Sequence, residues 1–180
     1  MRITISGPPG SGKTTVCKLL AERLGIDYVI SGNVFRSMAQ RLHLSLAEFG
    51  RLANEDPKYD RMIDEDMVST ARGKEDVVLE GRLAAHNLAR QGIPAFKVYL
   101  DAPPRVRAER IVEREHGDAD RALREMLERE ECEAERYRLW YGIDLGDMGV
   151  YDLVVDTSTL TPQEIVDLIV QKMGGARWQG

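Results

Sequence analysis

The first fifteen residues, MRITISGPPGSGKTT, constrain the fold more than any other stretch of the chain. Residues 3–5 alternate as in a short buried strand, and a turn opens at Gly7. Residues 7–14, GPPGSGKT, then match the pattern G-x-x-x-x-G-K-S/T of a phosphate-binding loop. The alternative is a plain glycine-rich turn, but the complete match, with an amphipathic run at 16–24 behind it, favours the loop. The sequence therefore predicts a site for a nucleoside triphosphate.

The chemistry of such a loop explains its residues. Glycines let the backbone curl so that successive N–H groups face one phosphate, and the helix that starts near Lys13 adds its positive end. The Lys13 ammonium can reach the outer phosphates, and the Thr14 hydroxyl can ligate a magnesium ion. We expect the ATP-binding residues to be Gly7, Pro8, Pro9, Gly10, Ser11, Gly12, Lys13, Thr14 and Thr15.

Length and composition limit the class of protein. A chain of 180 residues has room for one domain, and 43% hydrophobic with 31% charged residues is typical of a globular protein. No apolar run is long enough to cross a bilayer, and the formal charge of −5 argues against a nucleic-acid partner. Because the chain begins with a strand entering the loop, we expect no signal peptide. Cys17 and Cys132 lack metal-ligand spacing, so we expect reduced thiols in a cytoplasmic protein.

Strands and helices are expected to alternate along the chain. We expect strands at 3–5, 28–30, 77–79, 95–100 and 151–156, and helices at 14–24, 34–42, 46–53, 59–72, 103–114, 121–140 and from 161 onward. Ser45 with Glu48, and Thr161 before a proline, are typical of helix starts, and the glycine-rich tail 174–180 is expected to fray. The alternation predicts an α/β fold, a five-stranded parallel sheet with helices on both faces.

Ligands of such sheets gather at the carboxyl ends of the strands. The residues that follow these ends are predicted to line one cleft, and they are 7–14, Ser31, Gly32, Glu80, Gly81, Arg82, Asp101, Asp156 and Thr157.

Arginines are concentrated beside this edge: Arg36, Arg82, Arg107, Arg110, Arg114, Arg129 and Arg136. Guanidinium groups bind phosphate bidentately and stay charged. Phosphoryl transfer between two nucleotides brings several phosphate charges together, and a surplus of arginines neutralises them. For each arginine taken singly, a solvated helix face is an equally good reading.

Arg129, Glu133 and Arg136 share one face of a predicted helix. They form either surface salt bridges, or two phosphate clamps with a carboxylate between them that accepts a ribose hydroxyl. Their spacing alone slightly favours the salt bridges.

Glu80 ends the third strand, beside the loop in the usual sheet order of this motif. A carboxylate there can hold magnesium through water. A switch ATPase more often shows an aspartate–glutamate pair at this point, whereas Glu80, Gly81 and Arg82 offer an acid and then a phosphate binder. This favours transfer to a phosphorylated acceptor over hydrolysis.

On these residues the chain resembles nucleoside monophosphate kinases, and most closely the short, archaeal-type cytidylate kinases, over residues 1–173. The segments that carry the resemblance are GPPGSGKTT, ISGNVFRSMA, LANEDPKYD, VVLEGRLAAH, RAERIVERE, EREECEAERYRLWYGID and YDLVVDTS.

The resemblance implies a P-loop NTPase three-layer sandwich, a single domain at 1–173 with a helical monophosphate-binding insert at 31–72 and a lid at 114–121. It implies transfer of the γ-phosphoryl group of ATP to CMP, and also dCMP, with Mg²⁺, by a monomer. Alternatives are a monophosphate kinase that prefers AMP or UMP, a small-metabolite kinase, and an ATP-dependent switch.

The resemblance also implies site roles. The acceptor nucleotide would contact Ser31, Gly32, Phe35, Arg36, Gly81, Arg82, Arg129, Glu133 and Arg136. The expected catalytic residues are Lys13, Arg107, Arg110 and Arg129, with Arg110 and Arg114 in the lid and with Thr14 and, through water, Glu80 at the metal. Bacterial cytidylate kinases place an aspartate that helps read cytosine directly after the glycine–arginine pair, where this chain has Leu83. Base recognition therefore cannot be carried over from them.

Overall fold

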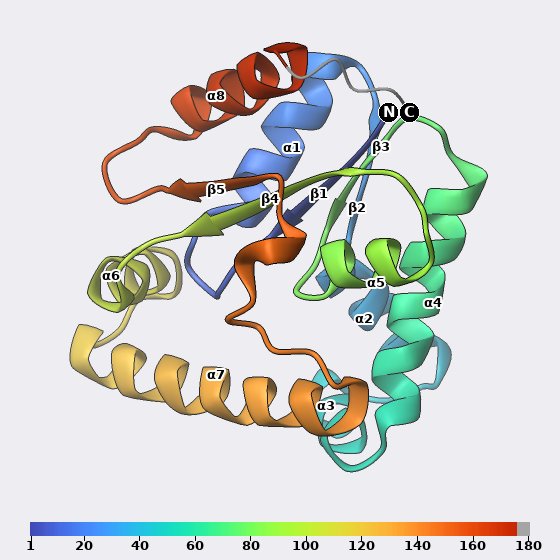
Figure 1. The fold of residues 1–180 in the computed structure, drawn as a ribbon. Coiled ribbons are helices and arrows are strands. Elements are labelled where there is room, and N and C mark those ends of the chain that lie inside the picture. Colours follow the sequence, from blue (N-terminus) through green and yellow to red (C-terminus); the bar gives the residue numbers. More distant parts are fainter. Residues whose placement is uncertain (176–180) are drawn as a thin grey trace.

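The computed structural model describes residues 1–175, without the side chains at positions 46, 47 and 115. Within these residues one parallel sheet has the strand order β2-β3-β1-β4-β5 (Figure 1). Its strands are β1 (Arg2–Ser6), β2 (Asp27–Ile30), β3 (Val77–Glu80), β4 (Phe96–Asp101) and β5 (Leu153–Asp156). The α/β prediction and the five predicted strands are thus confirmed, with ends that differ by one or two residues.

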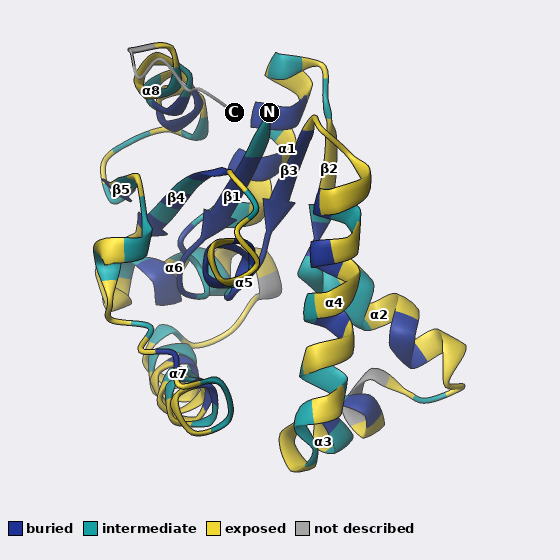
Figure 2. Cartoon of the chain, turned by 45° about the vertical axis from the view of Figure 1, so that its right-hand side comes forward, coloured by how far each residue is buried: buried dark blue, intermediate teal, exposed yellow. Residues whose placement is uncertain are grey.

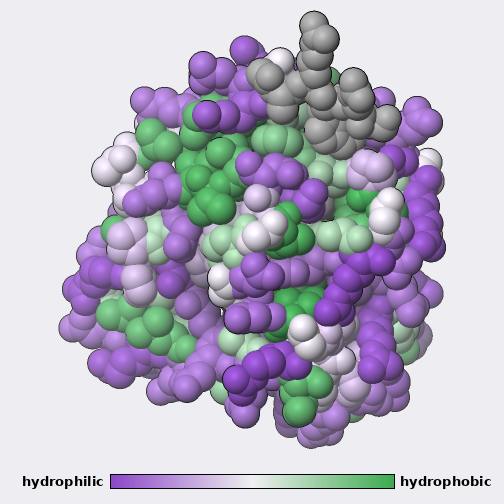
Figure 3. Space-filling view, in the orientation of Figure 1, coloured by the Kyte–Doolittle hydropathy of each residue, from purple (hydrophilic) through white to green (hydrophobic). Residues whose placement is uncertain are grey.

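The central strands are apolar because both of their faces are covered. All four residues of β3 are buried, and β1 is buried from Ile3 to Ser6. Figure 2 shows these strands as the buried centre of the molecule, whereas the helices are buried on some sides and exposed on others. The outer surface in Figure 3 is mainly hydrophilic, with hydrophobic residues gathered in small patches.

Helices α1 (Lys13–Leu24) and α8 (Pro162–Gly175) cover one face of the sheet. Leu20 of α1 and Ile169 of α8 are fully buried in the same cluster as Ile5 of β1. This packing holds α1, and with it the loop that precedes it, over the centre of the sheet.

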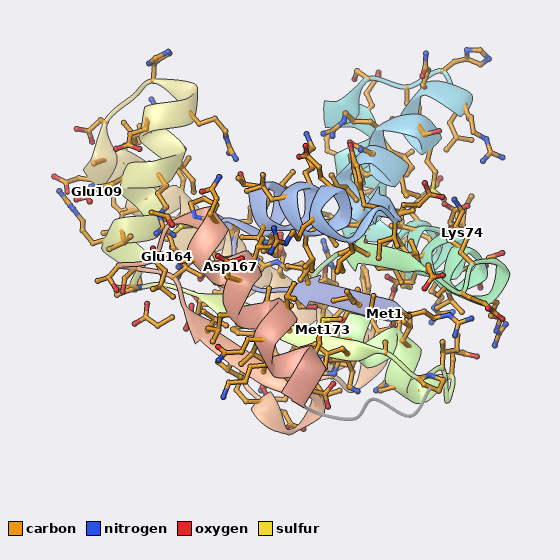
Figure 4. The ribbon with its side chains drawn as sticks, turned by 90° about the horizontal axis from the view of Figure 1, so that it is seen from above. Met1, Lys74, Glu109, Glu164, Asp167 and Met173 are labelled. Carbon is orange, nitrogen blue, oxygen red and sulfur yellow. The ribbon has the colours of Figure 1, made fainter. Side chains whose placement is uncertain are left out.

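The start of α8 agrees with the sequence, but its end does not. Thr161 Oγ1 accepts from the Glu164 N–H at 3.3 Å, and Glu164 Oε2 accepts from the Thr161 N–H at 2.8 Å. Glu164 and Asp167 lie on the exposed side of α8 (Figure 4). The predicted frayed tail at 174–180 is wrong at 174 and 175, which belong to the last turn of α8. An anchored helix extends at little cost, since each further residue adds one hydrogen bond. Residues 176–180 lie outside the described residues.

Helices α4 (Pro57–Gly73) and α5 (Ala84–Arg90) cover the opposite face. Ala71 of α4 and Leu88 of α5 are fully buried with Leu79 of β3. The sequence did not predict α5. Its seven residues are too few for a helical period to be recognised, and the helix is held by its packing on α4 and β1.

Helices α2 (Ser31–Arg41) and α3 (Leu46–Glu55) form, with α4, a helical excursion between β2 and β3. The excursion has its own small core, in which the tilted rings of Phe49 and Phe35 are in contact, with centroids 4.6 Å apart. The predicted capping box of Ser45 and Glu48 is present at the start of α3. In Figure 2, α2 and α3 project away from the sheet, whereas α4 runs back along it.

Helices α6 (Pro104–Glu115) and α7 (Ala119–Tyr141) pack against each other beyond the carboxyl ends of β4 and β5 (Figure 1). His116 joins them with a φ of 57°, and Asp118 caps α7 by accepting from the Arg121 N–H. A short 3₁₀ turn, η1 (Met148–Val150), follows α7 and was not predicted. None of the helices within residues 1–175 combines the length and apolar character needed to span a membrane.

Candidate active site

The loop between β1 and α1 lies at the carboxyl edge of the sheet, where its glycines take conformations that other residues avoid. Gly7, Gly10 and Gly12 have φ angles of +144°, +76° and +90°. A Cβ at Gly7 would lie 2.1 Å from the Leu100 carbonyl oxygen, and one at Gly10 would lie 2.6 Å from that of Arg107. A Cβ at Gly12 would meet open space. The first two glycines are therefore required by packing on β4 and α6, in addition to any role toward a phosphate.

We expect Gly7→Ala to lower the free energy of unfolding by at least about 3 kcal/mol, because the clash with backbone adds to the strained φ. Gly92→Ala is the matched control, since Gly92 also has a positive φ, +63°, but no atom within 4 Å of the added Cβ. The control should cost about 1 kcal/mol. Urea denaturation of both variants measures the difference, and equal losses would show that the Leu100 contact is unimportant.

Lys13 folds back over the loop. Its Nζ donates to the Pro8 carbonyl oxygen at 2.7 Å. Burial lowers the pKa of Lys13 to about 8, and the nearby Glu80 carboxylate opposes the shift. The ammonium is thus held inside the loop, where a bound anion would raise the pKa of Lys13 again and favour its charged form.

Thr14 and Glu80 place two oxygens side by side. Parallel pairing sets Ile5 of β1 opposite Glu80 of β3, and the Thr14 hydroxyl donates to Glu80 Oε2 at 3.2 Å. Burial raises the pKa of Glu80, although the Lys13 charge and the Thr14 hydrogen bond oppose this. A hydroxyl and a carboxylate fit a hard divalent cation. The described residues contain no cluster of three His, Cys, Asp or Glu that could hold a metal.

Arg107 of α6 holds the phosphate-binding loop by hydrogen bonds. Its side chain is buried, and it donates to the Ala102 carbonyl at 2.9 Å and to the Pro9 carbonyl at 3.1 Å. It also forms an ion pair with Glu130 of α7. These contacts tie the loop to α6 and α7 and neutralise part of the Arg107 charge.

Arg110 reaches the far side of the same loop. Its guanidinium donates to the hydroxyl and the carbonyl of Thr157, at 2.9 and 2.6 Å, and to the Gly10 carbonyl at 3.4 Å. The buried Thr157 hydroxyl in turn donates to the carbonyl of Asp101 at 2.9 Å and lies 3.3 Å from that of Ser11. Thr157, which the sequence placed at this edge without a role, therefore joins the loop to β4 and β5. Arg114, one helical turn further along α6, is exposed.

A cavity of about 850 Å³, here called the acceptor cavity, lies between the excursion, the end of β3 and α7. It brings together all nine residues expected to contact the acceptor nucleotide, and these are Ser31, Gly32, Phe35, Arg36, Gly81, Arg82, Arg129, Glu133 and Arg136. They come from two helices, α2 and α7, and the turn after β3, so their convergence is a property of the fold and not of their spacing in sequence.

Arg82 connects this cavity to the loop. Its guanidinium donates to the Gly7 carbonyl at 3.3 Å and to Glu133 Oε2 at 2.5 Å. Glu133 is buried and also accepts from Arg129 Nε at 2.8 Å. Burial opposes ionisation of Glu133, but Arg82 and Arg129 outweigh it and lower its pKa. The face of Arg129 and Glu133 is therefore more than a surface salt bridge.

Arg136 spans the cavity from α7 to the excursion. Its Nε lies 3.2 Å from Asp60 Oδ2 without hydrogen-bond geometry, and its Nη1 donates to Asn54 Oδ1. Asp60 and Asn54, together with Asp64 and Asn87, line the cavity and were not singled out from the sequence. The signal that could have found the two aspartates is their i, i+4 spacing on one helix.

The chain matches the model of the cytidylate kinase-like family over residues 2–159. A cytidylate kinase of Halobacterium salinarum is 44% identical over 170 residues, which cover 94% of this chain and 88% of the relative. A cytidylate kinase of Methanocaldococcus jannaschii is also 44% identical over 170 residues, covering 94% and 95%. One of Sulfolobus acidocaldarius is 39% identical over 173 residues, covering 94% and 92%.

Solved structures share the fold at low identity. An uncharacterised protein from Eubacterium ventriosum superposes with a TM-score of 0.74 at 19% identity, covering 97% of this chain and 98% of that chain. Shikimate kinase from Acinetobacter baumannii, in complex with shikimate, gives a TM-score of 0.65 at 20% identity, covering 99% and 95%. The predicted P-loop NTPase three-layer sandwich is confirmed.

Proposed function

Because this chain belongs to the cytidylate kinase-like family, we propose that it transfers the γ-phosphoryl group of ATP to CMP, giving ADP and CDP. The observation that carries the proposal is the cavity beside the phosphate loop, lined by four arginines and joined to the loop by Arg82. A site that only hydrolyses ATP needs no arginines beyond those beside the phosphate loop, so the four arginines of the cavity favour a phosphorylated acceptor. We extend the proposal to dCMP, which presents the same base and phosphate.

The transfer needs positioning more than proton chemistry. An anionic phosphate oxygen of CMP forms the new bond to the γ-phosphorus, and the bond from that phosphorus to the bridging oxygen breaks, so that ADP leaves with the electron pair. No general base is required, because the attacking oxygen is already ionised at neutral pH. Lys13, in the loop, neutralises charge on the transferring group.

Kinases of the P-loop fold use ATP with a divalent metal, and we propose Mg²⁺ here. The Thr14 hydroxyl would bind the ion directly and Glu80 through water, consistent with their 3.2 Å contact. When bound, the ion spreads charge over the donor phosphates.

We propose that the ion pairs of the cavity exchange when CMP binds. Arg36 and Arg82 would take the acceptor phosphate, and Glu133, released from Arg82, would accept a ribose hydroxyl while keeping Arg129. The excursion at 31–72 would act as the monophosphate-binding insert. The segment 114–121 would act as the lid and would close Arg110 and Arg114 on the donor phosphates of ATP, with Arg107 behind them. We also propose that the protein is a monomer.

We expect Arg129→Ala and Arg136→Ala to raise the KM for CMP at least about tenfold while the KM for ATP stays within about threefold, because each removes a cavity charge and neither touches the loop. Arg138→Ala, at an exposed position of the same helix, is the control and should leave both constants unchanged. Steady-state kinetics with CMP varied at saturating ATP measures this. If the cavity variants behave as the control does, these arginines have only a structural role.

The proposed substrate is tested with ATP, magnesium and each of CMP, dCMP, UMP and AMP at equal concentrations. We expect CMP and dCMP to give the highest kcat/KM. Fastest turnover of AMP or UMP would refute CMP as substrate but keep the monophosphate-kinase class. ATP consumption that is independent of all four acceptors would refute the class.

A further inference from the structure

Two aspartates of α4 face the cavity across from α7. Asp60 and Asp64 are four residues apart, so they lie one turn apart on one side of the helix, and both line the 850 Å³ cavity. Asp64 and Asn87 also line a second cavity of about 390 Å³, to which none of residues 7–14 contributes. These two residues therefore lie where the two cavities meet.

One oxygen of each of these carboxylates is left without a hydrogen bond. Oδ2 of Asp60 and Oδ2 of Asp64 are buried, and neither has a hydrogen-bond partner among the described residues. The Arg136 charge lies 3.2 Å from Asp60 Oδ2 but is not aligned for a hydrogen bond. Since buried polar atoms in proteins nearly always have a partner, two such oxygens in one cavity wall indicate that a ligand supplies donors.

Leu83, directly after Gly81 and Arg82, offers no polar group to a base. Leu83 is buried and packs with Tyr137 and Ile143, so it offers an apolar wall. The polar groups that remain on the excursion side and on α5 are Asn54, Asp60, Asp64 and Asn87. Asn54 is engaged by Arg136, which leaves the aspartates and Asn87.

We propose that Asp60 and Asp64, with Asn87 beside them, read the Watson–Crick edge of the acceptor base and select cytosine over uracil, an inference that rests on the proposed CMP kinase activity. Cytosine presents an amino donor at N4 next to an acceptor at N3, whereas uracil presents an oxygen at position 4 next to an N3–H donor. A carboxylate accepts from the cytosine amino group but repels the uracil oxygen. An amide or a protonated carboxyl group donates to cytosine N3.

The electrostatics of Asp64 suit both parts of this readout. Burial raises the pKa of Asp64 to about 7, the Asp60 charge raises it further, and Tyr141 and Asn87 oppose the shift. Near neutral pH the Asp64 side chain can therefore accept from N4 as a carboxylate or donate to N3 when protonated. Adenine carries the same donor–acceptor pair, so the aspartates separate amino-bearing bases from uracil and leave the choice between CMP and AMP to cavity shape.

The test is the ratio of kcat/KM for CMP to that for UMP in Asp60→Asn and Asp64→Asn. We expect at least one variant to lower this ratio at least about tenfold, because asparagine offers an N–H to the uracil oxygen and loses an acceptor for the amino group. Asp66→Asn, at an exposed position of the same helix, is the control and should keep the wild-type ratio. The affinities for CMP and UMP without ATP, measured by titration calorimetry, should shift in the same direction.

Unchanged ratios and affinities in both folded aspartate variants would overturn the inference while leaving the kinase intact. Wild-type protein that does not phosphorylate CMP would instead overturn the proposed function. Thermal unfolding is measured for each variant, and the conservative change to asparagine keeps the side-chain volume. Should one variant fail to fold, an unchanged ratio in the other, with Asn87→Ala also unchanged, would equally overturn the inference.

Discussion

Lys13→Ala is expected to lower kcat at least a hundredfold while leaving the protein folded. The Lys13 ammonium is held inside the loop by the Pro8 carbonyl, and losing an electrostatic contact to a transferring phosphoryl group typically costs a hundredfold or more. Lys18→Ala, at an exposed position of α1, is the control and should keep wild-type turnover. Near-normal turnover of Lys13→Ala would contradict the phosphate-loop mechanism.

The pH dependence of the free energy of unfolding gives a second, independent test of the buried Lys13 side chain. Burial lowers the pKa of Lys13 to about 8 from 10.5, so the folded protein disfavours the charged form. Between pH 8 and 10.5 the unfolded chain binds more protons, and the free energy of unfolding rises with pH from this group. Lys13→Met, which keeps the apolar stem, should therefore be at least as stable as wild type at pH 7, and its advantage should shrink above pH 8. Urea denaturation at pH 7 and pH 9.5 measures this difference, which amounts to about 1.4 kcal/mol per pKa unit.

Arg82→Ala is expected to lower kcat/KM for CMP about a hundredfold to a thousandfold, with the KM for ATP changed by less than about threefold. Arg82 is the only arginine among the described residues that contacts both the Gly7 carbonyl and a cavity carboxylate. Its loss removes the charge that lies where donor and acceptor phosphates would meet. Arg82→Lys keeps the charge but not the forked geometry, and it should lose about tenfold or more.

A second variant separates this role from simple neutralisation of Glu133. If Arg82 serves only to balance that buried carboxylate, Arg82→Ala combined with Glu133→Ala should recover most of the activity. The proposed role in phosphate binding predicts no recovery. The double-mutant cycle in kcat/KM, with unfolding measured in parallel, distinguishes the two outcomes.

The sequence was sufficient for the sheet and for the loop because both depend on local patterns. Each strand is a short apolar run beside a turn, and the loop motif implies β1 and β3 as neighbours, which puts Glu80 beside Thr14. Helix α5 was missed because seven residues show no clear period and its packing on α4 and β1 is tertiary.

The acceptor cavity could be predicted only in part, because its contacts join distant residues. The spacing of Arg129 and Glu133 is equally compatible with a surface salt bridge, and what makes Glu133 different is Arg82, 51 residues away. In the sequence Asp60 and Asp64 are ordinary charged positions of a helix. Their place in a cavity wall becomes visible only in the fold, where α7 lies across from them. Similarly, the glycine pattern of the loop indicates a phosphate site, whereas the contact of Gly7 with Leu100 exists only in the folded protein.

Transfer of a labelled phosphoryl group tests the central claim most directly. The protein is incubated with Mg²⁺, CMP and ATP labelled at the γ position, and the products are separated. We expect the label in CDP, in amounts equal to the ADP formed, and no loss of ATP when CMP is omitted. Label that appears only in inorganic phosphate, at a rate independent of CMP, would contradict the account.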